Sequence, residues 1–327
     1  MNVVEQLGLP NLEASLARVE RELSAAVGSD DRFLSEVAGH LIAAGGKRLR
    51  PALVLAAAAA CGAEATDEVV AGAVSVELVH LGSLYHDDVI DAAGERRGVS
   101  SVNARWGNLV AILVGDFLLA KASEIAASLG TEVAALLART IGQLCRGEVS
   151  QMEFAFDPGR PEEAYLRAIE GKTAALMATS SRIGALVSGA GTEATEALTE
   201  FGRCFGMAFQ IWDDIRDLVA SEEVLGKPAG HDMVEGTYTL PVIKALALPE
   251  LGPELRALLD GTIDGPTRDK ARDLVVASAA VEASIADASG WAARASEALS
   301  PLRDAGGAGV ESLGRLGSRL LETLDSP

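Results

Sequence analysis

The sequence predicts an all-α protein folded as a single domain over residues 1–327. Apolar side chains recur at helical spacing almost from end to end of the chain. No segment shows a convincing alternation of apolar and polar residues, and no Ser/Pro-rich linker divides the chain. Aromatic residues make up only 4% while Ala, Leu, Val and Glu dominate, a balance that favours helix over sheet. Together these observations predict a bundle of about ten or more helices.

The expected helices are bounded by capping residues and by Gly and Pro. The segment 11–27 carries an apolar face opposite a charged one. The next helix, 29–44, opens on the N-cap cluster Ser29-Asp30-Asp31 and ends at Gly45-Gly46. Further helices are expected over 51–62, 67–91, 105–129, 131–154, 161–189 and 192–219, and shorter ones fill 239–262 and 266–324.

Composition and charge exclude several classes of function. Acidic residues number 47 against 28 basic ones, so nucleic acid is not expected as a partner, because phosphate binding needs a basic face. Cys61, Cys145 and Cys204 stand far apart without metal-ligand spacing, and we expect buried thiols. The start MNVVEQLGLPN lacks the pattern of a signal peptide, and the longest apolar run, 52–61, is too short to span a bilayer. We therefore expect a cytoplasmic protein without a transmembrane segment.

Two acidic triads occur among apolar residues. DDVID places Asp87, Asp88 and Asp91 at spacing i, i+1, i+4, and DDIRD repeats that spacing at 213–217. Residues i and i+4 of a helix lie on one face, about 5–6 Å apart at Cβ, so each triad contains a pair of carboxylates one turn apart. One triad alone is equally well explained as a solvated helix end. Two triads, each late in a long apolar helix, favour a site for a divalent cation, above all Mg²⁺, which shares its coordination shell with substrate phosphates.

Basic residues occur in four places where anions would need them. Each alone is as easily a charge at a helix C-terminus. Together they fit two diphosphate groups held around a magnesium cluster, because glycine breaks leave backbone N–H groups free and arginine binds phosphate in a bidentate manner. The residues are Lys47, Arg48 and Arg50 in GGKRLRP, Arg96 and Arg97 in GERRG, Lys172 in GKT and Lys227 in LGKPAGHD.

In this order the motifs resemble those of the trans-isoprenyl diphosphate synthases (polyprenyl synthetases), over roughly residues 40–245. DDVIDAAGERRG is similar to the first aspartate-rich motif of that family, DDxxD followed by RRG, and FQIWDDIRD is similar to the second. The resemblance implies an all-α fold around a central prenyl-chain cavity, and a homodimer. It also implies head-to-tail trans condensation of isopentenyl diphosphate with an allylic diphosphate, with three Mg²⁺ ions per site.

The resemblance implies roles for single residues as well. The Mg²⁺ ions that grip the allylic diphosphate would be bound by Asp87, Asp88, Asp91, Asp213, Asp214 and Asp217. The same diphosphate would be held by Arg96, Lys172 and Lys227, and isopentenyl diphosphate by Lys47, Arg50, His80 and Arg97. Thr173 and Gln210 match the polar pair near the developing carbocation. Thr237, in GTYTLP, replaces the lysine of the family's frequent GKxTLP, which puts one auxiliary phosphate contact in doubt.

Product length is predicted from the face of the helix that ends at the first triad. One helical turn rises about 5.4 Å, close to one extended isoprene unit, so this face acts as a ruler. Short-chain members of the family place a bulky residue four or five positions before the first aspartate, where this chain has Ser83 and Gly82, with Val79 about a turn earlier. The prediction is a product of about C30 to C45. Alternatively, the small residues let another helix approach, or another helix supplies the floor, with Phe117 the candidate.

Three other functions share part of this pattern. A short-chain farnesyl or geranylgeranyl diphosphate synthase would share the motifs. A class I terpene cyclase shares the fold and one DDxxD motif but usually carries a different second metal motif, and GGKRLRP also argues against it. A non-catalytic subunit that sets chain length in a heteromer would lose the aspartates, and this chain keeps all six. The sequence therefore predicts a Mg-dependent trans-polyprenyl diphosphate synthase.

Overall fold

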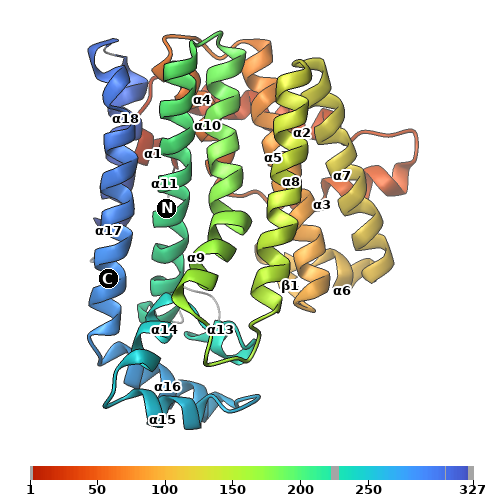
Figure 1. Cartoon of the computed structure of the whole chain (residues 1–327). Helices are drawn as coiled ribbons and strands as arrows, with labels where there is room; N and C mark the ends of the chain where they lie inside the picture. Colours follow the sequence, from red (N-terminus) through yellow and green to blue (C-terminus); the bar gives the residue numbers. More distant parts are fainter. Residues whose placement is uncertain (1–2, 222–227, 306, 323–327) are drawn as a thin grey trace. The chain divides into compact units, whose positions relative to one another are not determined.

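The computed structural model describes residues 3–221, 228–305 and 307–322, and the chain is helical almost throughout (Figure 1). This confirms the predicted all-α class. Within these ranges the strand pairing is confined to a two-residue antiparallel hairpin, β1 (Glu95–Arg96) with β2 (Val99–Ser100). Strands this short leave no alternating pattern in the sequence, which is why the hairpin was not predicted.

The chain forms two compact units. One comprises Met1–Ile141, Leu176–Gly202 and Ala298–Arg315, and the other comprises Gly142–Ala175, Arg203–Glu297 and Leu316–Pro327. Each is described by itself below, and the single domain over 1–327 stays a prediction.

The helices follow one another in the order that the sequence predicts. The first are α1 (Val3–Leu7), α2 (Leu12–Ala26), α3 (Arg32–Ala43), α4 (Leu49–Ala60), α5 (Asp67–Ile90), α6 (Val102–Trp106), α7 (Asn108–Ser128) and α8 (Thr131–Met152). Then come α9 (Glu162–Ile169), the π-helical turn η1 (Glu170–Ala174), α10 (Ala175–Val187) and α11 (Thr192–Val219). The last are α13 (His231–Val234), α14 (Leu240–Ala247), α15 (Gly252–Leu258), α16 (Gly265–Val276), α17 (Ala280–Ala298), the 3₁₀ turn η2 (Ser300–Ala305) and α18 (Ala308–Glu322).

Two of the expected helices are interrupted, and one expected buried thiol is exposed. The helix expected over 105–129 is divided at Gly107, whose φ of 89° is unsuitable for a helix interior. The helix expected over 161–189 is interrupted by η1. Cys145 is exposed, although a buried thiol was expected there. The N-cap expected before α3 is confirmed, because the Asp31 carboxylate accepts from two backbone N–H groups of the first turn.

Helix α5 is the core of the first unit and packs against α2, α4 and α7. By length and composition alone it could cross a membrane, but 72% of its most apolar window is buried inside the protein. A buried core helix has the same composition, so this is weak support for a membrane span. The helix ends at the first triad, and its packing therefore fixes the direction in which those aspartates leave the core.

Close packing accounts for one of the small residues on α5. A Cβ atom added at Gly82 would lie 3.1 Å from the Gly115 carbonyl oxygen and 3.2 Å from the Leu119 side chain, both on α7. Glycine at position 82 thus lets α7 approach α5, which was the alternative to a role in product length.

A buried ion pair fixes the loop between α3 and α4. Arg48 has a left-handed backbone (φ 48°) and is 5% exposed. Its Nη1 donates to Glu77 of α5 at 2.8 Å, and its Nη2 donates to Glu20 at 3.0 Å and to the Ile42 carbonyl at 3.2 Å. Burial raises the pKa of Glu77, and Arg48 acts against that shift. The pair therefore holds the GGKRLRP segment on the core helix.

We expect Arg48→Ala to lower the free energy of unfolding by about 3–5 kcal/mol, because it leaves the Glu77 carboxylate buried without its cation. Urea unfolding at pH 7 measures this loss, with Arg139→Ala, at an exposed position of α8, as the control. The loss should shrink as the pH is lowered and Glu77 takes up a proton. Equal stability of the two variants would contradict a structural role for the pair.

Candidate active site

The first triad lies at the end of α5, and its three aspartates differ in exposure. Asp91 is exposed and Asp87 is half-buried, whereas Asp88 is fully buried. The Asp88 Oδ1 accepts from both Nε and Nη2 of Arg96, each at 2.7 Å. Burial raises the pKa of Asp88, and Arg96 acts against that shift. Asp88 therefore fixes the hairpin that carries Arg96, while Asp87 and Asp91 lie toward the surface one helical turn apart.

A cationic cluster stands beside this triad in the same unit. Burial lowers the pKa of Arg50 and the charge of Arg97 lowers it further, while Glu77 and Asp87 act the other way. Burial also lowers the pKa of His80 well below its ordinary value, and nearby arginines, led by Arg50 and Arg97, shift it in the same direction. The structure thus brings together Arg50, His80 and Arg97, three of the four residues predicted to hold isopentenyl diphosphate. The fourth, Lys47, is exposed on the loop just before α4, and Arg50 lies in the first turn of that helix.

The cluster has features of a preformed anion site. The Arg97 guanidinium donates to the backbone carbonyls of Leu41 and Gly45. A Cβ atom at Gly46 would lie 2.9 Å from that guanidinium carbon, so a larger residue there would have to displace the Arg97 side chain. Among the described residues, the buried Nε of Arg50 has no hydrogen-bond partner. An N–H donor left over among cations is suited to a phosphate oxygen.

The second triad lies near the end of α11, in the other unit. Asp213 is exposed, and Asp214 and Asp217 are buried. The Asp214 carboxylate accepts from the Tyr165 hydroxyl at 2.6 Å and from Nε2 of Gln210 at 2.8 Å. Burial raises the pKa of Asp214 well above its ordinary value, Asp232 adds to the shift, and the two hydrogen bonds oppose it. As at the first triad, a buried aspartate is held by its neighbours, and here it is Asp214.

The π turn η1 carries Lys172 and Thr173 of the GKT motif. It forms where the backbones of α8 and η1 approach closely, since a Cβ atom at Gly147 would lie 2.5 Å from the Lys172 nitrogen. The Lys172 ammonium pairs with Glu148 at 2.8 Å, and the Thr173 hydroxyl donates to Oε1 of Gln210 at 2.5 Å. Single π turns within α-helices often occur at functional sites.

The remaining residues of the predicted set are Lys227, Thr237, Val79 and Ser83. Lys227 lies outside the described residues. Thr237 donates its backbone N–H to the Asp232 carbonyl at 2.8 Å. Val79 is fully buried, and Ser83 is half-buried, its hydroxyl donating to the His80 carbonyl at 2.9 Å.

Two residues that contact the predicted set, Glu148 and Tyr165, have no signal in the sequence. Tyr165 precedes its partner Asp214 by 49 positions. Glu148 likewise lies well before Lys172 in the chain. Neither residue shares a helix turn with its partner, so local spacing gave no signal for them.

The donors of the two triads fit a hard divalent cation, because both offer carboxylate oxygens only. In the part of the chain that the structure describes, no three His, Cys, Asp or Glu side chains converge closely enough to hold a metal ion by themselves. Mg²⁺ suits such a partial shell, since it usually takes one or two carboxylates and completes its octahedron with water and substrate phosphates.

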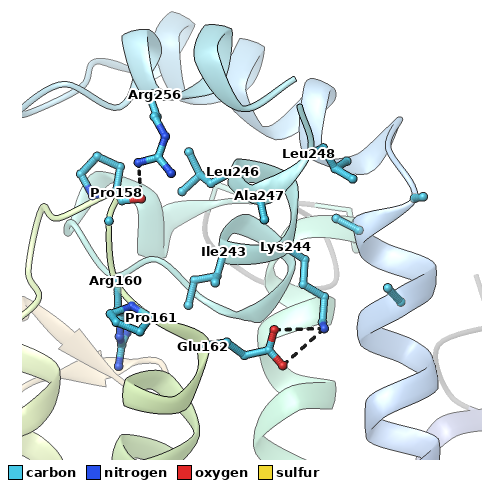
Figure 2. Close-up of a pocket in the computed structure, with 14 residues that line it drawn as sticks. Pro158, Arg160, Pro161, Glu162, Ile243, Lys244, Leu246, Ala247, Leu248 and Arg256 are labelled. Atoms are coloured by element: carbon cyan, nitrogen blue, oxygen red, sulfur yellow. Dashed lines mark hydrogen bonds and ion pairs between the residues drawn. The ribbon is translucent and has the colours of Figure 1, made fainter. Parts of the chain in front are cut away.

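A cavity of about 550 Å³ in the second unit is separate from these residues (Figure 2). Among the described residues, none of the predicted site residues lines it. Lys244 on its wall pairs with Glu162 at 3.2 Å and Asp287 at 2.9 Å, and Arg256 donates to the Pro158 carbonyl at 2.9 Å. Two of the three cations that line the cavity, Lys244 and Arg256, are already partnered, and among the described residues no aspartate lines it, so it lacks the carboxylates that the triads offer.

The chain matches the family model described as polyprenyl synthetase over residues 31–277. It is 45% identical to heptaprenyl diphosphate synthase component 2 of Geobacillus stearothermophilus, with 74% of this chain and 78% of that protein covered. It is 43% identical to nonaprenyl diphosphate synthase of Mycobacterium tuberculosis (77% and 76% covered) and 44% identical to geranylgeranyl diphosphate synthase of Methanosarcina mazei (65% and 67%). The solved polyprenyl synthase of Caulobacter crescentus, complexed with calcium and isoprenyl diphosphate, superposes with a TM-score of 0.89 at 35% identity, with 97% of each chain covered.

We expect the His80 imidazole to stay neutral well below pH 6.5, because burial and the neighbouring arginines disfavour its charged form. Nitrogen-15 NMR of the four histidines follows this directly, with His80→Gln to assign the signal. The unfolded chain takes up this proton first, so stability should fall as the pH drops through 6.5, and His80→Gln should flatten that fall. An imidazole that titrates near its ordinary value would contradict the cationic cluster.

Proposed function

This chain belongs to the polyprenyl synthetase family, and from that premise we propose that it joins isopentenyl diphosphate head-to-tail to an allylic diphosphate, forming a trans-polyprenyl diphosphate. The observation that carries the proposal is the repeated triad. In each, one aspartate is buried and fixed while another lies exposed on the same stretch of helix. That arrangement suits carboxylates that bind a cation without losing their own positions.

The reaction begins when the allylic C–O bond breaks and leaves a delocalised cation and a diphosphate. We propose that the six aspartates bind Mg²⁺, which when bound would absorb the charge of the departing diphosphate. Arg96 and Lys172 hold the same diphosphate, together with Lys227. Asp88 orients Arg96, and Glu148 orients Lys172.

Isopentenyl diphosphate is proposed to bind at Lys47, Arg50, His80 and Arg97. A neutral His80 contributes one N–H donor and no charge, while the two arginines supply the cations. The isopentenyl double bond attacks the allylic cation and a proton then leaves. The departing diphosphate takes that proton, so no separate base side chain is required.

A product of about C30 to C45 is proposed from the small residues before the first triad. The similarity to heptaprenyl and nonaprenyl synthases supports this length. The geranylgeranyl synthase relative favours a shorter product as the second candidate. Since Gly82 packs against α7, Ser83 and Val79 are the better candidates for the wall of the product site.

The experiment that tests the function is product analysis. Purified chain is incubated with Mg²⁺, labelled isopentenyl diphosphate and farnesyl diphosphate, and the prenyl alcohols are resolved by length after phosphatase treatment. We expect products of about C30 or longer. Asp87→Asn and Asp213→Asn should abolish turnover with the fold intact, and Asp116→Asn, an exposed acid on α7, is the control.

Other outcomes of product analysis are equally informative. Turnover retained in Asp87→Asn would refute the metal assignment. A C20 product would keep the reaction and give the shorter alternative. No product from the chain alone would indicate that it needs a second component, as the name of the Geobacillus relative implies for that protein.

We expect Ser83→Phe to shorten the product to about C15–C20, because a ring at this half-buried position would block the path along α5. Leu84→Phe is the matched control, since that side chain points about 100° further round the same helix. Gly82→Phe is a poorer probe because its ring would collide with α7. Unchanged product length in Ser83→Phe would move the floor to another helix, with Phe117 the first candidate.

A homodimer is proposed from the outer face of α7, which exposes Leu109, Ile112 and Leu113 at helical spacing. Sedimentation velocity should give twice the chain mass of 33.7 kDa. Leu113→Glu should shift the protein to the monomer, and Ala138→Glu, at an exposed position of α8, should not. A wild-type monomer at micromolar concentration would contradict the proposal.

A further inference from the structure

A chain of hydrogen bonds in the second unit links Thr173 to a buried tyrosine. Thr173 donates to Oε1 of Gln210, and the other end of that amide, Nε2, donates to Oδ1 of Asp214. The Tyr165 hydroxyl donates to the remaining oxygen, Oδ2. The Arg160 guanidinium lies 5.5 Å from the centre of the Tyr165 ring. The predicted site residues Thr173, Gln210 and Asp214 thus depend on a side chain that was not in the predicted set.

The direction of each hydrogen bond in this chain depends on the next. A glutamine amide has one accepting end and one donating end, whereas a carboxylate only accepts. Asp214 therefore turns the amino group of Gln210 toward itself and its carbonyl oxygen toward Thr173. Thr173 must then donate to that carbonyl, so the lone pairs of its hydroxyl oxygen are left for another neighbour.

Burial keeps water away from this chain of hydrogen bonds. Tyr165 is 1% exposed and Asp214 is 5% exposed, so water does not compete for their hydrogen bonds. Arg160 is equally buried at 5%, and its Nη1 donates to the Tyr238 carbonyl at 3.2 Å. Figure 2 shows Arg160 next to Pro161 and away from Arg256. The Arg160 guanidinium lies over the Tyr165 ring, and this cation–π contact holds the ring in place.

We propose that Tyr165, supported by Arg160, is a positioning residue that fixes Asp214 and thereby turns the Gln210 amide so that the Thr173 oxygen faces the allylic cation. The proposal rests on the proposed function, because it assigns the oriented oxygen to that reaction. A lone pair held toward developing positive charge stabilises the transition state more than the bound substrate. Tyr165 therefore acts on the rate of ionisation and not on the binding of either diphosphate.

The matched pair of variants is Tyr165→Phe and Tyr238→Phe. The first removes the hydroxyl that holds Asp214 but keeps the ring beneath Arg160. Tyr238 is also fully buried in this unit, and its hydroxyl donates to the Leu259 carbonyl at 3.0 Å, outside the chain of bonds. Each variant loses one buried hydrogen bond, so their thermal stabilities should fall by similar amounts.

Kinetics and binding are then measured on both variants. For Tyr165→Phe we expect kcat to fall by about tenfold or more, as for partners of groups at other active sites, with unchanged KM for isopentenyl diphosphate. The Mg²⁺-dependent affinity for a farnesyl thiolodiphosphate, which does not ionise, should stay unchanged by calorimetry. Tyr238→Phe should leave all three quantities at wild-type values.

Three results would overturn the proposal. One is an unchanged kcat in Tyr165→Phe, and another is an equal loss in Tyr238→Phe. The third is a loss of thiolodiphosphate affinity that matches the loss of kcat, since Tyr165 would then act on ground-state binding. Absence of product from the wild-type chain would instead refute the proposed function, so the two failures are distinguishable.

A second measurement needs no substitution that could unfold the protein. The chain has four glutamines, and nitrogen-15 labelling of their side chains resolves each amide. The proposal expects the Gln210 amide protons to exchange slowly with D₂O in the free enzyme, because one is held by Asp214. Fast exchange of all four amides would contradict a fixed orientation.

Discussion

The constraint on which the rest of this structure depends is the cost of gathering carboxylates among apolar helices. Like charges repel, and a buried carboxylate without partners is strongly disfavoured. Both triads meet this constraint in the same way. Arg96 neutralises Asp88, and Tyr165 with Gln210 hydrogen-bonds Asp214. In each triad a buried aspartate, Asp88 or Asp214, is held by its neighbours, while an exposed one, Asp91 or Asp213, lies at the surface.

The same constraint accounts for features that look unrelated along the chain. The two-residue hairpin places Arg96 over Asp88. The interruption of the predicted helix 161–189 has a similar consequence, because the π turn lets Thr173 reach Gln210 while Tyr165 one segment earlier reaches Asp214. The hairpin and the π turn thus both carry side chains that connect to a buried carboxylate.

The sequence predicted the parts of the site that depend on local spacing. Long helices with one-sided apolar faces, such as α8 and α11, have their own periodic signal, and each triad is visible in its i, i+1, i+4 spacing. Contacts over long sequence separation have no such signal, which is why Tyr165 and Glu148 were missed. Gly82 shows a second limit, because a small residue fits equally a helix contact and an open cavity, and only the position of Leu119 distinguishes them.

Charge explains why the few basic residues are concentrated where they are. A diphosphate substrate carries several negative charges, and the chain itself has a formal net charge of −19, so the average field repels it. The electrostatic potential must therefore be positive where the diphosphate binds. Arg50 and Arg97 supply positive charge beside the first triad, and the Arg48–Glu77 pair holds the start of α4, the helix that carries Arg50, without adding net charge. Salt screens a distant acidic surface more than a contact inside a cleft, so the long-range repulsion and the local attraction respond differently to ionic strength. The acidic surface and the basic cluster thus act at different ranges, and under the proposed function the short-range cations have to outweigh a repulsion that weakens with screening.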